Sequence, residues 1–325
     1  MRAPDFWRTD NVLARFLDPF GQIAGGITAR RAMRAPLVRA AAPVICVGNL
    51  TTGGTGKTPV TASIVRRLGA MGRTPAVLMR GYGGRLKGPV RVDARAHSAD
   101  DVGDEALLHA KRGAVWVSQV RAQAAGPALA DGADVLVMDD GHQHSTLAKD
   151  LSILVVDGSA GFGNGRIFPA GPLREPIQGG LARAQAAVIM GEDRLGLAAS
   201  LSERLPVLRA RLVPGPEAQR LKGERVVAFA GIGDPRKFYE ALVSVGARVS
   251  AFHPFDDHYA FDVADIEPIL DEAFAIGAIP VTTEKDAVRL APDQRQQVNV
   301  LSVDVAWEKP DALDGLLEGL LGKAR

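Results

Sequence analysis

Residues 53–58 read Gly-Gly-Thr-Gly-Lys-Thr, a set of residue types and a spacing that suit the binding of phosphate groups. Glycines let backbone N–H groups turn inward around phosphate oxygens, and a lysine at this spacing reaches the outer phosphates of a nucleotide. Thr58 occupies the position whose hydroxyl coordinates magnesium in such loops. The predicted nucleotide contacts are Gly53, Gly54, Thr55, Gly56, Lys57 and Thr58.

The loop departs from the usual pattern at one position, because G-x-x-x-x-G-K-[ST] would place a glycine where this chain has Thr51. The alternative is a glycine-rich turn that merely precedes a lysine. An apolar run at 44–47 comes before the loop and a helical pattern at 60–68 comes after it. Strand, loop and helix is the order that a phosphate-binding loop requires, so we favour that interpretation.

A second part of such a site follows the apolar strand 135–138, which runs directly into Asp139 and Asp140. A carboxylate at this place holds the magnesium shell that neutralises a transferring phosphoryl group. Thr58, Asp139 and Asp140 are therefore the predicted Mg²⁺-site residues, and Asp140 is either a ligand or an orienter of that site. The His-Gln-His at 142–144 has room to contact an acceptor or phosphates, and its histidines lack further partners at the spacing of a zinc site.

Four more segments place reactive side chains at predicted strand ends or helix starts. They are the basic turn 80–84, the acidic run 100–105, the proline-rich loop 168–176 and the loop 252–261 with its histidines. For each of them a plain loop, a helix cap or a surface turn stays open on the residues alone.

The stretch Thr282–Asp286 also stands at a predicted strand end and resembles the guanine-reading Asn-Lys-x-Asp motif. Lys285 and Asp286 are adjacent, however, with no residue between them, and the sequence contains no true guanine-specificity motif. The roles of Lys285 and Asp286 stay open at this point.

Strands that alternate with helices must position these residues, and they predict an α/β fold: a P-loop NTPase-like, doubly wound, mostly parallel sheet. We expect its last strand at 186–190, an extended connector at 207–213, and then a second, smaller α/β domain. The predicted divisions are an N-terminal region at 1–42, a nucleotide domain at 43–213, and a smaller lid domain with a C-terminal helix at 214–325.

The composition is that of an ordinary globular protein: 325 residues, 46% apolar, 23% charged, with a net charge of +2. This length is comfortable for two domains, and the small net charge gives no indication of a nucleic-acid partner. The single cysteine, Cys46, lies in the apolar strand before the phosphate loop. We interpret it as a buried thiol in a reducing compartment.

Residues 1–42 differ from the rest, since they combine apolar residues at helical spacing with seven arginines and three aspartates. Arg15 and Asp18 interrupt the apolar stretch, so it cannot span a bilayer, and it lacks the core of a secretory signal. Two interpretations stay open: an amphipathic helix packed on the following domain, or an interfacial helix with aromatics in lipid and arginines at anionic headgroups.

Several strings, in this order, resemble the tetraacyldisaccharide 4′-kinases of lipid A biosynthesis, and they cover about 44–290. They are Gly48-Asn49-Leu50 with Gly53 to Pro59, Arg80-Gly81-Tyr82, Gly103-Asp104-Glu105, Asp139 to His144, Pro169 to Pro176, Asp257-His258 with Phe261, and Thr283 to Asp286. Each string alone is weak evidence for the family, whereas the whole set in this order is specific for it.

The resemblance implies a magnesium-dependent lipid kinase, with ATP giving its γ-phosphoryl group to the 4′-hydroxyl of tetraacyldisaccharide 1-phosphate to form lipid IVA. It implies a peripheral position on the cytoplasmic face of the bacterial inner membrane, with the N-terminal helix docked on the bilayer. That implication favours the interfacial interpretation of residues 1–42.

The resemblance also implies roles for individual residues. Asp104 matches a general base for the sugar hydroxyl, His258 matches a histidine from the second domain that pairs with it, and Lys57 stabilises the phosphates. Further positions match the family's active site without individual roles: Tyr82, Asp140, Gln143, His144, Arg174 and Glu175. Asp104 and His258 in different domains would make closure assemble the site.

Three other functions compete with this reading. A P-loop switch or chaperone would hydrolyse nucleotide without an acceptor, and the missing guanine motif counts against it. A kinase of a soluble small molecule would not need the N-terminal amphipathic segment. A non-catalytic membrane-binding module would leave Asp104, Lys57 and the paired aspartates without a purpose. Acyl-chain preference and oligomeric state are not determined by the sequence.

Overall fold

The computed structural model describes residues 4–323 and is built on a nine-stranded sheet with the order β13-β8-β7-β6-β1-β5-β2-β4-β3. The inner strands pair in parallel, while β3 and β13 are antiparallel to their neighbours at the two edges. The strands are β1 (Val44–Gly48), β2 (Pro75–Met79), β3 (Val90–Arg91), β4 (Ala114–Val117), β5 (Val135–Asp139), β6 (Leu151–Asp157), β7 (Ala186–Met190), β8 (Val207–Pro214) and β13 (Val303–Trp307). The predicted mostly parallel sheet is thereby confirmed.

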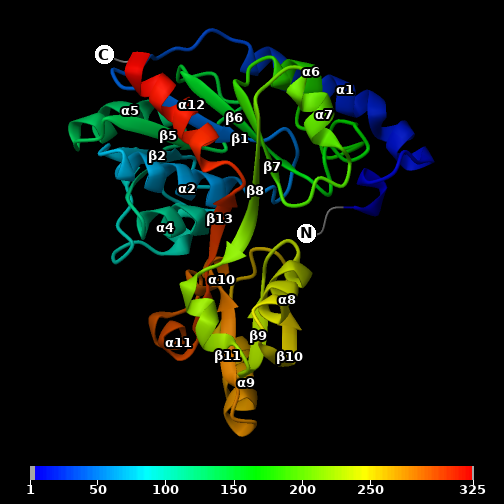
Figure 1. The fold of residues 1–325 in the computed structure, drawn as a ribbon, viewed down its shortest axis with the longest axis vertical. Coiled ribbons are helices and arrows are strands. Elements are labelled where there is room, and N and C mark those ends of the chain that lie inside the picture. Colours follow the sequence, from blue (N-terminus) through cyan, green and yellow to red (C-terminus); the bar gives the residue numbers. More distant parts are fainter. Residues whose placement is uncertain (1–3, 324–325) are drawn as a thin grey trace.

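Helices cover both faces of this sheet, as expected for a doubly wound fold (Figure 1). One core unites the sheet with α2, α4 and α12, and a second core lies beneath α5 on the other face. The helices of this unit are α2 (Lys57–Ala70), α3 (Ala99–Val102), α4 (Asp104–Ala110), α5 (Arg121–Ala130), α6 (Ile177–Leu181), α7 (Leu197–Ser202) and α12 (Pro310–Lys323). Cys46 is fully buried in β1, as predicted.

A smaller unit hangs below the large sheet in Figure 1 and has a four-stranded parallel sheet of order β10-β9-β11-β12. Apolar cores lie on its two faces. Its strands are β9 (Arg225–Ala230), β10 (Arg248–Pro254), β11 (Ile279–Thr283) and β12 (Asn299–Leu301). Its helices are η2 (Pro216–Leu221), α8 (Pro235–Ser244), α9 (Val263–Ala275), α10 (Glu284–Ala287) and α11 (Pro292–Gln297).

The predicted division at 214–325 is wrong for its last part, because the chain returns to the large unit after β12. β13 pairs antiparallel with β8, so β7 is not the last strand of the large sheet. In α12, Leu313, Leu317 and Leu321 recur every fourth residue and are buried in the core of the large unit. This apolar stripe needs a partner surface, and the large sheet supplies it. The two strands β8 and β13 connect the units (Figure 1).

The N-terminal region contains η1 (Asp5–Trp7) and α1 (Val12–Ala32), and its Arg2 lies outside the described residues. Small residues of α1 face the large unit: Gly21 and Gly25 pack so closely on Ile167 that neither position has room for a Cβ. The large apolar residues face outward instead: Val12, Leu13, Phe16, Phe20, Ile23 and Ile27. Packing on the domain therefore uses the small face of the helix and leaves its large apolar face free. Within residues 4–323, no helix is both long and apolar enough to cross a bilayer.

Candidate active site

The phosphate loop connects β1 to α2 at the carboxyl edge of the large sheet. Gly53 (φ 108°) and Gly56 (φ 87°) adopt left-handed backbone conformations, which glycine tolerates without a Cβ clash. Thr51 forms a β-bridge to Leu173, and the N–H of Thr52 donates to the Pro172 carbonyl at 2.7 Å. The missing glycine at 51 is explained by this pairing, because an extended, paired residue has no need of glycine.

The P-loop lysine lies beside the second aspartate of the β5 pair. Lys57 Nζ is 3.7 Å from Asp140 Oδ1, and Arg174 Nη1 donates to both oxygens of that carboxylate at 2.8 and 2.9 Å. Burial opposes ionisation of Asp140, yet Lys57 and Arg174 hold its pKa below the usual range. Burial lowers the pKa of Lys57. Arg174 and the P-loop lysine thus share one carboxylate, that of Asp140.

The first aspartate of the pair fits a magnesium ligand better than the second. Asp139 ends β5 beside Val47 of β1, so it stands at the base of the loop. Its Oδ2 lies 2.9 Å from His109 Nε2, while its buried Oδ1 has no hydrogen-bond partner among residues 4–323. A hard oxygen donor left free in this way suits Mg²⁺, which in phosphoryl-transfer sites binds one or two protein carboxylates together with water and substrate phosphates. The Asp140 oxygens already carry two cations.

Two groups near this pair escaped prediction from the sequence. Arg121, at the start of α5, is buried, and its Nη2 donates to the backbone carbonyls of Asp139 and Asp140 at 3.1 and 3.0 Å. His109 is equally buried, four residues after Glu105 on α4. The sequence pattern did not mark either residue as part of a site. Arg121 only begins a helix, and His109 falls on the apolar face of one.

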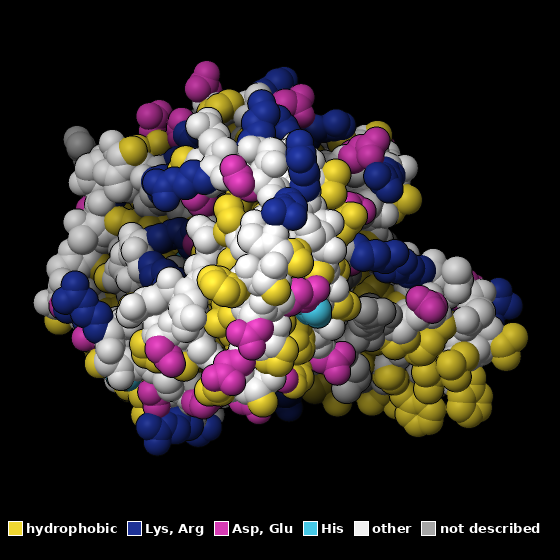
Figure 2. All heavy atoms as spheres, turned by 90° about the horizontal axis from the view of Figure 1, so that it is seen from below, with side chains coloured by type: hydrophobic (Ala, Val, Ile, Leu, Met, Phe, Trp, Pro, Cys, Tyr) yellow, Lys and Arg dark blue, Asp and Glu magenta, His cyan; other side chains and the backbone are white. Residues whose placement is uncertain are grey.

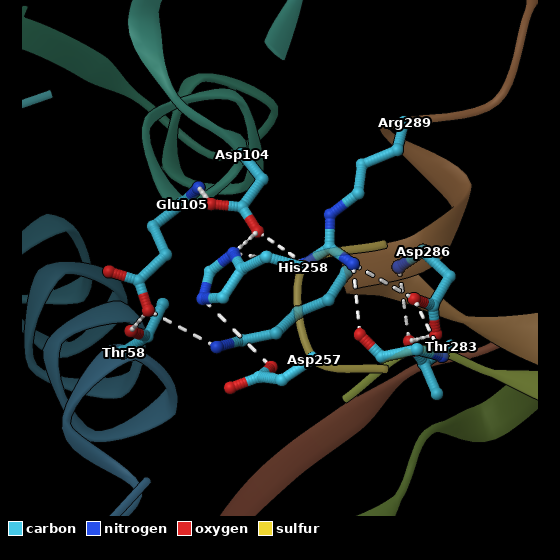
Figure 3. Close-up of polar contacts among 10 residues, drawn as sticks. Thr58, Asp104, Glu105, Asp257, His258, Thr283, Asp286 and Arg289 are labelled. Carbon is cyan, nitrogen blue, oxygen red and sulfur yellow. Dashed lines mark hydrogen bonds and ion pairs between the residues drawn. The ribbon is translucent and has the colours of Figure 1, made fainter. Parts of the chain in front are cut away.

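The predicted base, Asp104, begins α4 and is met by side chains from the small unit (Figure 3). His258 Nδ1 lies 3.1 Å from Asp104 Oδ2, and Arg289 Nη2 donates to the same oxygen. Burial raises the pKa of Asp104, but the hydrogen bonds from His258 and Arg289 outweigh it and lower that pKa far below the usual value. The hydrogen bond to Asp104 in turn raises the pKa of His258 against the effect of burial.

Backbone geometry holds this pair in place. His258 adopts a left-handed conformation (φ 59°), and its N–H donates to the Gly231 carbonyl at 3.1 Å. Gly103, just before Asp104, packs against the backbone of Tyr82 with no room for a side chain. The exposed Tyr82 ring lies edge-on to His258, with centroids 6.4 Å apart. The basic turn 80–84 is therefore part of the site wall.

Glu105 links this pair to the phosphate loop. Thr58 Oγ1 lies 3.3 Å from Glu105 Oε1, and Lys285 Nζ reaches the same oxygen at 3.1 Å (Figure 3). The hydroxyl predicted for magnesium and the predicted base are thus connected through adjacent residues of α4. Residues far apart in the chain, from α2, α4 and α10, converge here.

The remaining predicted residues are Gln143, His144 and Glu175, of which Gln143 and Glu175 bond to each other next to Asn49. Gln143 donates to the Asn49 carbonyl at 2.8 Å and to Glu175 at 3.0 Å, while the fully buried Glu175 pairs with Arg183 at 2.7 Å. These contacts fix the loop after β6 against β1, which indicates a supporting role. Burial lowers the pKa of His144 to about 4, so its imidazole is neutral near pH 7.

Comparison with known proteins decides the family. The family described as tetraacyldisaccharide-1-P 4′-kinase matches residues 13–321. The chain belongs to this family. A tetraacyldisaccharide 4′-kinase from Rhodospirillum rubrum is 54% identical over 325 residues, 99% of this chain and 98% of the relative. One from Paramagnetospirillum magneticum is 54% identical over 319 residues, 98% of each chain.

Among solved structures, LpxK from Aquifex aeolicus in complex with ATP matches with a TM-score of 0.76 and 27% identity. The match covers 95% of this chain and 99% of that one. This chain thus has the fold of LpxK from Aquifex aeolicus along nearly its whole length, and the resemblance stated from the motifs is confirmed.

Proposed function

We propose that this protein is an ATP- and Mg²⁺-dependent kinase that phosphorylates the 4′-hydroxyl of tetraacyldisaccharide 1-phosphate and so makes lipid IVA for lipid A biosynthesis. The observation that carries the proposal is the link from Thr58 through Glu105 to the adjacent Asp104. It brings Thr58 of the phosphate loop close to the helix start that carries the Asp104 carboxylate, which supports phosphoryl transfer to a hydroxyl with Asp104 as the proton acceptor. Family membership supplies the substrate class.

In the proposed reaction, the 4′-oxygen forms a bond to the γ-phosphorus of ATP while the bond from that phosphorus to the β–γ bridging oxygen breaks. The hydroxyl proton passes to the carboxylate of Asp104, and ADP leaves with the bridging oxygen. Lys57 and Arg174 offer positive charge to the phosphates. Magnesium, held by Thr58 and Asp139, would neutralise charge on the transferring group.

His258 orients the base from the other unit. Its Nδ1 contact to Asp104 joins the loop after β10 to the start of α4. The Asp104 base therefore has its histidine partner only while the two units are in contact. We propose that closure of the small unit over bound substrates assembles the site and excludes water. The small unit thereby acts as the lid.

The acceptor is a lipid, and α1 offers a surface for reaching it. Its large apolar residues point away from the large unit, and Figure 2 shows a cluster of hydrophobic side chains on the side where α1 lies in Figure 1. Arg30 and Arg31 stand in the last turn of the helix. We propose peripheral docking of α1 on the cytoplasmic face of the inner membrane, with arginines at anionic headgroups.

One incubation tests the proposed function: the purified full chain, γ-labelled ATP, Mg²⁺ and tetraacyldisaccharide 1-phosphate in mixed micelles. Label is expected in the lipid, and a Lys57→Met variant should lose nearly all of that transfer. Label released only as inorganic phosphate, at a rate independent of the lipid, would contradict a kinase and favour a nucleotide-hydrolysing switch.

A further inference from the structure

The Thr-Glu-Lys-Asp stretch at 283–286 builds an anchor for one arginine. Asp286 is fully buried, and its Oδ2 accepts from Thr283 Oγ1 at 2.6 Å. Its Oδ1 accepts from the Gly231 N–H and from Arg289 Nη1, both at 3.1 Å. Arg289 Nη1 also donates to the Gly231 carbonyl at 3.0 Å. One edge of the guanidinium is therefore fixed inside the small unit.

The other edge of the guanidinium leaves the small unit and crosses to the large one. Arg289 Nη2 donates to Asp104 Oδ2, and the arginine side chain is 7% exposed (Figure 3). The same nitrogen lies 3.5 Å from His258 Nδ1, so both side chains converge on a single carboxylate oxygen. An arginine that only stabilised the small unit would not need this contact with Asp104 of the large unit.

This convergence decides which oxygen of Asp104 can serve the reaction. Oδ2 carries two side-chain donors, while Oδ1 accepts only the Glu105 N–H at 2.8 Å among residues 4–323. A carboxylate oxygen has two lone-pair sites, so Oδ1 keeps one for the acceptor hydroxyl. The positive charge of Arg289 beside Oδ2 keeps the Asp104 carboxylate ionised. A weakly basic but permanently ionised carboxylate suits a loose phosphoryl-transfer transition state, in which little covalent chemistry is left to the protein.

We propose that Arg289, anchored by Asp286, is a positioning residue for phosphoryl transfer: it orients the Asp104 carboxylate, leaves Oδ1 free for the acceptor hydroxyl, and does so only while the small unit contacts α4. The inference rests on the proposed function, in which Asp104 takes the hydroxyl proton. The Thr-Glu-Lys-Asp stretch then serves to anchor the Arg289 guanidinium and not to recognise a guanine base. Lys285 extends the same contact to Glu105.

The test compares Arg289→Gln, which removes the charge, with Arg289→Lys, which keeps it. A matched control is Arg112→Met, because Arg112 joins the same two units through Glu284 at 2.7 Å without touching Asp104. Initial rates of lipid phosphorylation are measured with the full chain from pH 5 to 9, together with thermal unfolding and ATP affinity. The charged groups that face Asp104 are His258, Arg289 and Lys285, while the carboxylate of Asp257 faces His258 and that of Glu105 faces Lys285.

Loss of the Arg289 charge should raise the pKa of both Asp104 and His258, since that charge lowers both. For Arg289→Gln we expect kcat to fall by about 10- to 100-fold, with ATP affinity unchanged. Because Asp104 stays ionised from pH 5 to 9, the limb of kcat/KM that moves is that of His258, and it should move to higher pH by about one unit. Arg289→Lys should restore the position of the limb and much of kcat, and Arg112→Met should keep the wild-type profile.

A lower plateau with an unmoved limb in Arg289→Gln, or the same loss in Arg112→Met, would overturn the proposal, because either result describes a structural contact only. Arg289→Met replaces the Gln variant if that variant is unfolded. If Arg289→Gln and Arg289→Met are both unfolded, the Arg289→Lys variant decides. A shifted pH profile of kcat/KM in that charged variant would also overturn the proposal. Failure of the proposed function can be told apart from failure of this inference, because the wild-type protein itself would then leave the lipid unlabelled.

Discussion

The outward face of α1 allows a quantitative test of membrane docking. Phe16 is 70% exposed and Phe20 is 59% exposed, one turn apart on the same helix. Complete burial of such a side chain contributes about 1.5–3 kcal/mol. Since roughly two thirds of each side chain is still in water, insertion of both would contribute about 3 kcal/mol in total. Replacement of both by alanine should therefore weaken binding to vesicles by about 100-fold.

The assay is co-sedimentation of the full chain with vesicles of phosphatidylethanolamine and phosphatidylglycerol, over a range of lipid concentrations. Phe274→Ala is the matched control, because Phe274 is 88% exposed on α9, at the far end of the molecule from α1 (Figure 1). We expect the control to bind like the wild type. The double variant should also show a raised KM for lipid in vesicles with a nearly unchanged kcat.

Unchanged vesicle binding by the Phe16, Phe20 double variant would refute the reasoning, and so would equal weakening by Phe274→Ala. In the first case the apolar face of α1 would not enter lipid. In the second case binding would depend on general hydrophobicity and not on this helix.

Three other predictions concern the buried and titratable groups. His258→Ala should lower kcat by about 100-fold with little change in the KM for ATP, and unchanged turnover would end its role in orienting Asp104. His109→Leu removes the partner of Asp139 Oδ2, so about tenfold more Mg²⁺ should be needed for half-maximal rate, whereas an unchanged Mg²⁺ titration would argue against a role for His109 in orienting this ligand. Burial lowers the pKa of His142 to about 4 from 6.5, so the unfolded chain binds more protons between these pH values. The free energy of unfolding should therefore fall by roughly 3 kcal/mol as the pH drops from 6.5 to 4. Above pH 6.5 the histidine is neutral in both states and this loss is absent. Thermal unfolding of His142→Leu should depend less on pH over that window than that of the wild type, and parallel curves would contradict this.

Patterns confined to a few neighbouring residues determined much of this protein. The phosphate loop, the strand that ends in Asp139 and the alternation of strands with helices are local features. Glycine torsion angles, apolar periodicity and strand ends act within about ten residues, so they can be recognised without a structure. The same holds for the apolar character of α1, although not for which of its faces packs.

Contacts between distant segments were decided only by the tertiary structure. Arg289 and Asp104 are separated by 185 positions, and His109 and Asp139 by 30, so no spacing links them. The return of β13 and α12 to the large sheet was missed for the same reason: an apolar stripe shows that a helix needs a surface, but not which surface. The residue types of the site were thus readable from the sequence, whereas the partners that set their charge and orientation were not, because hydrogen bonds and ion pairs depend on distance in space and not on distance along the chain.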